Sequence, residues 1–177
     1  GSVAPFAQKN FYREMTVRLR TLMKEEAAGD FPSYRIFCNS RLPEKEIAAA
    51  SGLGRMGRNS LVFLPGEGSL FVLGGLLFPV SGGDEETLRA EVRRNALPEP
   101  GEICGPCNAC VSACPTGAIV GPGLVDRKRC IQGLAAEPAE VPRDIREKWG
   151  TVLYGCQACQ DVCPLNRNAP AGADTVF

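Results

Sequence analysis

The chain has 177 residues, 44% of them hydrophobic and 23% charged, and its 20 basic and 20 acidic side chains cancel to a net charge of zero. This length suits one or two domains with a buried core, and the balanced charge gives no general attraction to nucleic acid or membranes. Histidine is absent, which excludes hydrolytic relays through histidine, histidine zinc sites, Rieske centres and histidine ligation of haem or cobalt by this chain.

Nothing in the sequence is typical of membrane insertion or secretion. The longest strongly apolar run, Leu70 to Val80, is interrupted by glycine and is shorter than the roughly 20 residues that span a bilayer. No basic region followed by an apolar signal segment opens the chain. We therefore expect a cytoplasmic protein without membrane contacts.

The first predicted element is an amphipathic helix over residues 6–28, ended by Gly29. Its apolar residues recur at helical spacing with basic residues between them: Phe11, Met15, Leu19 and Leu22. Residues 1–60 hold ten Lys and Arg against six Asp and Glu. This surplus is typical of a solvated helix face, and it gives only weak support for a nucleic-acid partner.

A short strand over residues 34–37 and a helix over 42–51 come next. PGEG at 65–68 then separates two apolar runs, 61–64 and 69–78, which predicts a hairpin. A lone hairpin is marginally stable. We therefore expect it to join a larger sheet or a second copy of the chain, which makes a homodimer a candidate assembly.

Glycines 52, 54 and 57 form the pattern G-x-G-x-x-G ahead of this hairpin. A dinucleotide-binding fingerprint needs a strand before the pattern and a helix after it, and the predicted order here is the reverse. We expect these glycines to let the backbone approach a cofactor or a metal cluster closely. A loop and a helix through Leu97 follow, and then a linker over residues 98–101.

Nine cysteines are many for a chain without a secretory signal, and an odd number favours metal binding over a disulfide framework. CGPCNACVSACP at residues 104–115 has the spacing C-x2-C-x2-C-x3-C-P of bacterial ferredoxins. In this pattern three closely spaced thiolates bind one 4Fe-4S cluster, and the fourth binds a second cluster. The stretch therefore needs a cysteine from elsewhere to complete its own site.

YGCQACQDVCP at residues 154–164 repeats the ending of this motif. Its first position would fall at Leu153, and we predict that Cys130 takes that corner from a longer loop. The first cluster then takes Cys104, Cys107, Cys110 and Cys163. The second cluster takes Cys114, Cys130, Cys156 and Cys159. Because each motif lends one thiolate to the other cluster, the two clusters must lie close together.

The alternative is a pair of zinc sites with four cysteines each. Zinc sites of this kind commonly use two separated CxxC pairs, which the crowded run at 104–114 fits poorly. We therefore predict an α+β protein: an N-terminal α/β sheet fragment with helices over residues 3–97, and a bacterial-ferredoxin-like double-cluster domain over residues 98–177.

Four stretches together resemble the central part of the epoxyqueuosine reductases: GLGRMGRNSLVFLPGEGSLFVLGGLL, CGPCNACVSACPTGAIV, VDRKRCIQ and YGCQACQDVCPLN. The resemblance implies two 4Fe-4S clusters, a cobalamin cofactor, and reduction of an epoxide in a modified tRNA nucleoside during queuosine biosynthesis. The family in turn resembles the cobalamin-dependent reductive dehalogenases. The resemblance also implies a loop that lies along the corrinoid, formed by Gly52, Gly54, Gly57 and Asn59.

The chain departs from the family's pattern in two respects. The family has further residues before this region, and many members carry a helical-repeat tail. Where the family has its proposed proton donor, an aspartate, this sequence has Cys38 followed by Asn39. Three roles stay open for Cys38: a buried inert thiol, a catalytic residue at a cofactor or substrate site, or a cluster ligand.

We weigh two main functions. The first is an electron-transfer iron–sulfur protein that passes single electrons to a corrinoid or another redox partner, which needs only eight cysteines. The alternative is an oxidoreductase, a cobalamin-dependent reductase of the epoxyqueuosine reductase type that acts on tRNA or a small substrate, with Cys38 or Tyr34 as proton source. A weaker third hypothesis is an iron–sulfur scaffold with a structural or sensing role.

Overall fold

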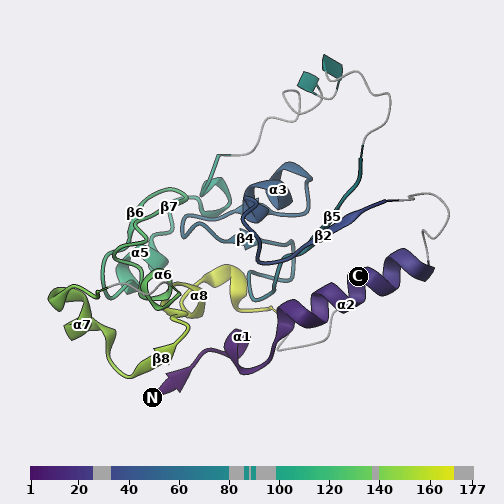
Figure 1. The fold of residues 1–177 in the computed structure, drawn as a ribbon. Coiled ribbons are helices and arrows are strands. Elements are labelled where there is room, and N and C mark those ends of the chain that lie inside the picture. Colours follow the sequence, from purple (N-terminus) through teal and green to yellow (C-terminus); the bar gives the residue numbers. More distant parts are fainter. Residues whose placement is uncertain (26–32, 80–85, 88, 91–98, 137–139, 170–177) are drawn as a thin grey trace.

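The computed structural model describes residues 1–25, 33–79, 86–87, 89–90, 99–136 and 140–169. In these ranges the chain forms short helices and two-stranded sheets, which confirms the predicted α+β class. Figure 1 shows them as a sheet-bearing half around β2, β5 and α2, and a cysteine-bearing half around α5, α6 and α8. No helix in the described part of the chain is both long and apolar enough to cross a membrane.

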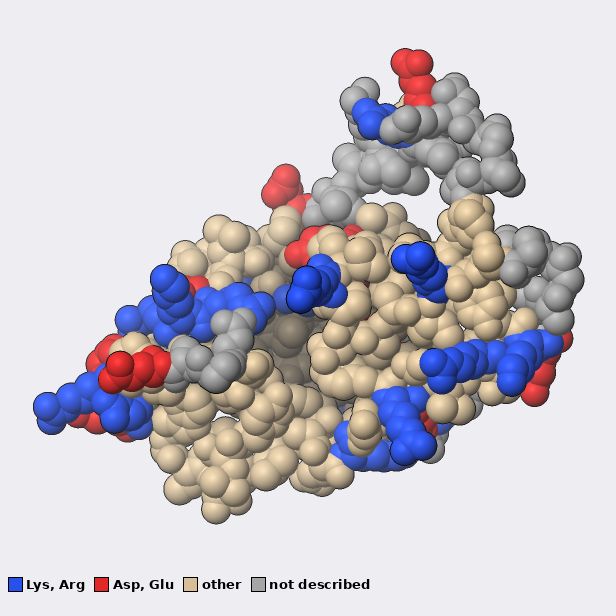
Figure 2. Space-filling view, viewed as in Figure 1, with Lys and Arg blue, Asp and Glu red and all other residues tan. Residues whose placement is uncertain are grey.

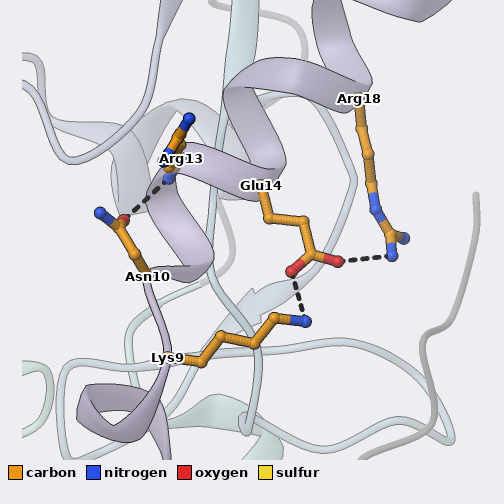
Figure 3. Close-up of polar contacts among 5 residues, drawn as sticks. All are labelled: Lys9, Asn10, Arg13, Glu14 and Arg18. Carbon is orange, nitrogen blue, oxygen red and sulfur yellow. Dashed lines mark hydrogen bonds and ion pairs between the residues drawn. The ribbon is translucent and has the colours of Figure 1, made fainter.

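The N-terminal segment forms two helices where we predicted one. Helix α1 spans Pro5–Gln8 and α2 spans Phe11–Glu25. Lys9 between them is extended, and Asn10 Oδ1 accepts a hydrogen bond from the Arg13 backbone N–H at 3.0 Å (Figure 3). An asparagine at a helix start satisfies a backbone N–H group that has no partner within the helix. The prediction of one continuous helix is therefore wrong.

Ion pairs fix the first turns of α2. Glu14 contacts Lys9 Nζ at 2.6 Å and Arg18 Nη2 at 2.8 Å (Figure 3). The bond from Lys9, with a smaller contribution from Arg18, lowers the pKa of Glu14. A carboxylate in the first turn also interacts favourably with the helix dipole.

The apolar stripe of α2 packs against the segment that leads into the sheet. A Cβ added at Gly74 would lie 2.6 Å from Met15 and 3.3 Å from Leu19, so a side chain there would push the helix away. The predicted end of this helix at Gly29, and most of the helix predicted through Leu97, lie outside the described residues.

The first sheet joins two segments that are far apart in the sequence. Strand β2 (Arg35–Phe37) pairs antiparallel with β5 (Gly75–Leu77), and the two run side by side in Figure 1. The short strand predicted at 34–37 is confirmed. The predicted hairpin is wrong, because its second arm pairs with β2 and its first arm, β4 (Val62–Phe63), pairs with β3 (Arg55–Met56).

PGEG forms a tight turn without extending into a hairpin. Leu64 and Gly68 exchange two backbone hydrogen bonds, at 2.9 and 3.2 Å. The ladder stops there because the next N–H, from Ser69, donates to Asn166 Oδ1 of the cysteine-bearing half at 2.8 Å. A long-range polar contact therefore overrides the local hairpin pattern.

The glycine loop lies between helix α3 (Glu44–Ala50) and β4. Helix α3 begins within two residues of its predicted start. A Cβ at Gly54 would lie 2.6 Å from the Phe63 carbonyl oxygen, and a Cβ at Gly57 would overlap the Phe63 ring. Close packing on Phe63 therefore explains two of the three glycines.

The cysteine-bearing half consists of short elements joined by turns. They are η1 (Glu102–Cys104), α5 (Ala109–Ala113), β6 (Ile119–Gly121), β7 (Leu124–Val125), α6 (Ile131–Ala135), α7 (Arg143–Trp149), α8 (Ala158–Asp161) and η2 (Pro164–Asn166). Helix α5 packs against α8, and β6 pairs antiparallel with β7. Helix α7 begins after Pro142 and ends at Gly150 as predicted, with its Ile145 side chain fully buried.

Contacts cross between the two halves. Strand β1 (Ser2–Val3) pairs in parallel with β8 (Val152–Tyr154), so the first residues join the cysteine-bearing half. The backbone N–H of Gly101 donates to the Met56 carbonyl at 2.8 Å. The division into domains near residue 98 stays a prediction.

Candidate iron–sulfur site

Each cysteine motif wraps around a short helix. Cys104 ends η1, Gly105 turns the backbone at φ +50°, and α5 carries Cys110 in its first turn. The Cys107 N–H donates to the Cys104 carbonyl at 3.0 Å, which closes the curl. The second motif repeats the arrangement with Cys159 on α8, so the two motifs are similar in structure as well as in sequence.

Three cysteines at the ends of these elements share one backbone conformation. Cys114, Cys130 and Cys163 have φ/ψ values of −68°/113°, −72°/120° and −72°/122°. Two of them precede a proline, which disfavours the helical region for the residue before it. Cys130 has no proline after it and reaches the same conformation at the N-terminus of α6. These are the three positions that the sequence predicts to serve a cluster outside their own motif or loop.

Cys163 lies with the cysteines of the first motif. Burial raises the pKa of Cys110, and the neighbouring Cys104 and Cys163 raise it further. Burial also raises the pKa of Cys163, and Cys104 and Cys107 add to this effect. Since charges perturb one another in this way mainly at short range, Cys163 lies near the first motif, and its ligation of the first cluster stays a prediction.

The remaining four cysteines form the second group. Burial raises the pKa of Cys156, and the neighbouring Cys130 and Cys114 raise it further. Burial also raises the pKa of Cys159 to about 12, with smaller contributions from Cys156 and Cys130. Among the cysteines whose pKa is affected, Cys159 therefore lies in the surroundings that raise the pKa most, and it would have to lose its proton to bind iron.

The two groups adjoin each other where α5 packs on α8. Cys110 of the first group contributes to the raised pKa of Cys159 in the second. Among the described residues, no three Cys, Asp or Glu side chains are gathered as the ligands of a single metal ion.

The loop that carries Cys130 is held beside Cys114 by backbone contacts. The Cys130 N–H donates to the Asp126 carbonyl at 2.9 Å, and the Asp126 N–H donates to the Ala118 carbonyl at 2.8 Å. The Arg129 side chain donates from Nε to the Thr116 carbonyl at 3.0 Å. The second motif has Leu153 where its first cysteine would fall. These bonds instead hold the distant Cys130 close to the other cysteines.

Backbone N–H groups point at two of the sulfurs. Ala118 donates to Cys114 Sγ at 3.2 Å, and Arg58 of the glycine loop donates to Cys104 Sγ at 3.3 Å. Burial alone would raise the pKa of Cys114, but the N–H groups of Ala118 and Thr116 outweigh it and lower that pKa. Such donors stabilise a negatively charged cluster, and the one from Arg58 comes from the sheet-bearing half.

A polar network that the sequence did not predict joins the halves. Asn166 Nδ2 donates to the Gln160 carbonyl at 3.0 Å, and Gln160 Nε2 donates to the Ser69 carbonyl at 2.9 Å. Ser69 and Asn166 also bond directly. Isolated Ser, Gln and Asn residues carry no pattern in a sequence, so no signal could have identified this set.

Lys45 is a second residue that the sequence analysis missed. Its Nζ donates to the Ser60 carbonyl at 2.8 Å and to Ser60 Oγ at 3.1 Å. Burial lowers its pKa, and it lies near enough to Cys130 to be affected by that thiol. A cation from α3 therefore lies beside the second cysteine group.

The predicted corrinoid-contacting residues differ in their surroundings. Gly52 has φ +77° and nothing within 4 Å of an added Cβ, so it faces open space. Gly54 and Gly57 pack on Phe63, and Asn59 is only 6% exposed. Contact between these four residues and a corrinoid stays a prediction.

Cys38 lies apart from the two cysteine groups. Its Sγ donates to the Leu73 carbonyl at 3.1 Å, and burial followed by the nearby Glu44 raises its pKa. Glu44 in turn accepts hydrogen bonds from the Asn39 and Ser40 N–H groups, which fixes the turn that follows Cys38. The thiol is protonated at neutral pH, and its role stays a prediction.

Comparison with known proteins agrees with this geometry. The 4Fe-4S double cluster binding domain matches residues 103–166. The chain is 38% identical over 168 residues to epoxyqueuosine reductase of Burkholderia pseudomallei, covering 92% of this chain and 40% of that protein. It is 41% identical over 149 residues to epoxyqueuosine reductase of Vibrio cholerae, covering 81% of this chain and 36% of that protein.

Solved structures lead to the same family. Epoxyqueuosine reductase from Streptococcus thermophilus superposes with a TM-score of 0.67 at 27% identity, over 89% of this chain and 40% of that one. An epoxyqueuosine reductase with a tRNA-Tyr epoxyqueuosine-modified stem loop superposes with a TM-score of 0.61 at 28% identity, over 90% and 39%. This chain thus spans about 40% of the length of its relatives. The resemblance seen in the sequence is confirmed: the chain is a homologue of the epoxyqueuosine reductases and contains a 4Fe-4S double cluster binding domain.

Proposed function

We propose that this chain is the electron-delivering part of a reductase of the epoxyqueuosine reductase type. The observation that carries the proposal is the match of residues 103–166 to the 4Fe-4S double cluster binding domain, supported by interactions between cysteines of the two motifs. When bound, 4Fe-4S clusters supply one-electron transfer at low potential. The comparisons favour this function over a stand-alone electron-transfer protein, because the relatives carry the name of a reductase.

We propose the ligand sets that the cysteine spacing predicts, and the interactions among the cysteines support them. The first cluster would be held by Cys104, Cys107, Cys110 and Cys163. The second would be held by Cys114, Cys130, Cys156 and Cys159. The donor set fits iron–sulfur ligation, since it consists of thiols alone and N–H groups already point at Cys104 and Cys114.

The chain's own residues would position and shield the clusters. The conformations of Cys114 and Cys163 are restricted by the prolines that follow them, so these corners are preorganised before ligation. The packing of α5 on α8 keeps the two groups adjacent, which a chain of one-electron transfers requires.

A corrinoid is the second cofactor of the proposed reductase. Gly52 has open space where a Cβ would lie, and Gly54 and Gly57 pack on Phe63 in the same loop. Cys38 is the proposed proton donor, because the resemblance aligns it with the family's proposed acid and burial raises the pKa of its thiol. Its hydrogen bond to Leu73 would have to open for transfer.

Transfer RNA is the proposed substrate, following the relative whose structure holds a modified tRNA stem loop. Figure 2 shows basic side chains gathered where α2 lies and at the opposite end, where α7 lies. Helix α2 contributes Arg13, Arg18, Arg20 and Lys24. Phosphate contacts from such residues give affinity that falls steeply with salt, so binding of the stem loop should weaken between low and physiological salt.

Anaerobic reconstitution followed by spectroscopy tests the proposal. We expect about eight irons per chain, four for each cluster. Cobalamin added to the reconstituted protein should bind and change its visible spectrum under a low-potential reductant. Iron loading without cobalamin binding would support the stand-alone electron-transfer protein instead.

A further inference from the structure

The glycine loop reaches both cysteine groups through two consecutive residues. The Arg58 backbone donates to Cys104 Sγ at 3.3 Å, and its guanidinium donates to the Gly105 carbonyl at 3.1 Å. The next residue, Asn59, lies near Cys159 of the second group. One turn of backbone from the sheet-bearing half therefore contacts both candidate cluster sites.

The Asn59 side chain is buried with half of its hydrogen-bonding capacity unused. It is 6% exposed, and its Oδ1 accepts a long hydrogen bond from the Leu61 N–H at 3.4 Å. Its Nδ2 has no hydrogen-bond partner among the described residues. Buried amide groups are almost always satisfied, so this open amide nitrogen needs a partner that the described residues do not supply.

The neighbouring acceptor is the sulfur of Cys159. The Asn59 side chain acts on this thiol as a hydrogen-bond donor and opposes the effect of burial on its pKa. Asn59 Nδ2 makes no formed hydrogen bond to this sulfur, and a thiol is in any case a weak acceptor. A thiolate bound to iron carries negative charge and is a stronger acceptor.

We propose that Asn59 is a positioning residue of the second cluster, donating an N–H···S hydrogen bond to Cys159 and thereby raising the reduction potential of that cluster. The proposal rests on the proposed two-cluster function and assigns Asn59 to a cluster, where the resemblance alone implied a corrinoid contact. Hydrogen bonds to cluster sulfurs favour the reduced and more negative state, which is the physical basis of the expected shift. Through Arg58 and Asn59, the sheet-bearing half would act on both clusters.

Redox titration followed by electron paramagnetic resonance tests this on the reconstituted full chain. The variants are Asn59→Ala, which removes the amide, and Asn59→Asp, which keeps the acceptor for Leu61 but replaces the donor. The matched control is Asn108→Ala, because Asn108 lies between two ligands of the first cluster but is exposed and donates to the Pro106 carbonyl. We expect the midpoint potential of one cluster to fall in Asn59→Ala and further in Asn59→Asp, with the other cluster and the control unchanged.

The outcomes separate this proposal from the proposed function. Full iron content with both midpoint potentials as in the wild type would overturn the role of Asn59 and leave the two-cluster assignment intact. An equal shift of both clusters would also overturn it, since that indicates a general structural effect. If Asn59→Ala loses iron, the midpoint potentials of Asn59→Asp test the proposal instead. This variant keeps the acceptor for Leu61 and therefore the shape of the loop. A wild-type chain that holds far fewer than about eight irons contradicts the proposed function itself.

Discussion

The two halves of the molecule are stabilised in different ways. In the sheet-bearing half, Val62 and Phe63 are buried under the glycine loop, but Val17 and Leu22 of α2 are about half exposed. The sheet-bearing half contains the 15-residue helix α2, whereas the elements of the cysteine-bearing half are only two to seven residues long. Segments this short form little structure alone, so the cysteine-bearing half depends on its ligands and the sheet-bearing half on packing.

Polar contacts join the two halves. They include the network of Ser69, Gln160 and Asn166 and the loop that presents Arg58 and Asn59. This difference teaches that the cluster site cannot be understood from its motif alone, because the other half supplies donors to it. Cluster ligation, apolar packing and the polar contact between the halves should therefore respond to different substitutions.

Removal of iron should have the largest effect. Because ligand binding supplies much of the folding free energy of a small metal domain, the chelated protein should lose its structure from about residue 100 onward. The segment from α2 to β5 should keep more of its protection. Hydrogen exchange measured by mass spectrometry on chelated and loaded protein checks this, and equal loss in both halves would contradict the contrast.

Cys163→Ala should disrupt the first cluster, although the residue belongs to the second motif. Its sulfur lies with Cys104, Cys107 and Cys110, so about half of the iron should be lost or become labile. Iron analysis together with the electron paramagnetic resonance signal of the remaining cluster checks this. Loss confined to the site of Cys156 and Cys159 would show that the groups are not interleaved.

Asn166→Ala should weaken the contact between the halves by a smaller amount. It removes bonds to Ser69 and Gln160 and leaves buried groups unpaired, which should cost about 1–3 kcal/mol in the free energy of unfolding. Anaerobic denaturant titration of the loaded protein checks this. Asn108→Ala, at an exposed position, is the control and should change the free energy of unfolding very little.

Cys38→Ser should have the smallest structural effect. The hydroxyl can keep the bond to the Leu73 carbonyl, and the thiol lies apart from both cysteine groups, so iron content and stability should match the wild type. Reductase activity in an assembled enzyme should fall if this thiol is the proton donor. A loss of iron in Cys38→Ser would instead identify it as a ligand.

The sequence predicted the α+β class and the 4Fe-4S double cluster domain, and the ligand set of each cluster stays a prediction. The spacing of the cysteines constrains which thiolates can share a cluster, and the interactions of Cys156 with Cys130 and of Cys163 with Cys104 agree with the two predicted sets. The hairpin around PGEG failed because Ser69 bonds to Asn166, which lies 97 positions away. The helix break at Asn10 depended on one capping bond within a continuous apolar stripe.

In the glycine loop, the residues that form the motif are not the residues that reach the cysteines. Its pattern indicated close approach to a cofactor, but Gly54 and Gly57 are required by Phe63. The residues that reach the cysteine groups, Arg58 and Asn59, follow the pattern and carry no signature of their own. The sequence predicted a loop close to a cofactor or cluster, and the three-dimensional arrangement identifies Arg58 and Asn59 as the residues near Cys104 and Cys159.

Electron paramagnetic resonance of the fully reduced, anaerobically reconstituted chain tests the central claim most directly. Two 4Fe-4S clusters built from interleaved motifs lie close together, so the reduced protein should show two paramagnetic centres whose signals are broadened by their mutual interaction. A single isolated signal, two signals without interaction, or a chain that holds zinc in place of iron would contradict the account.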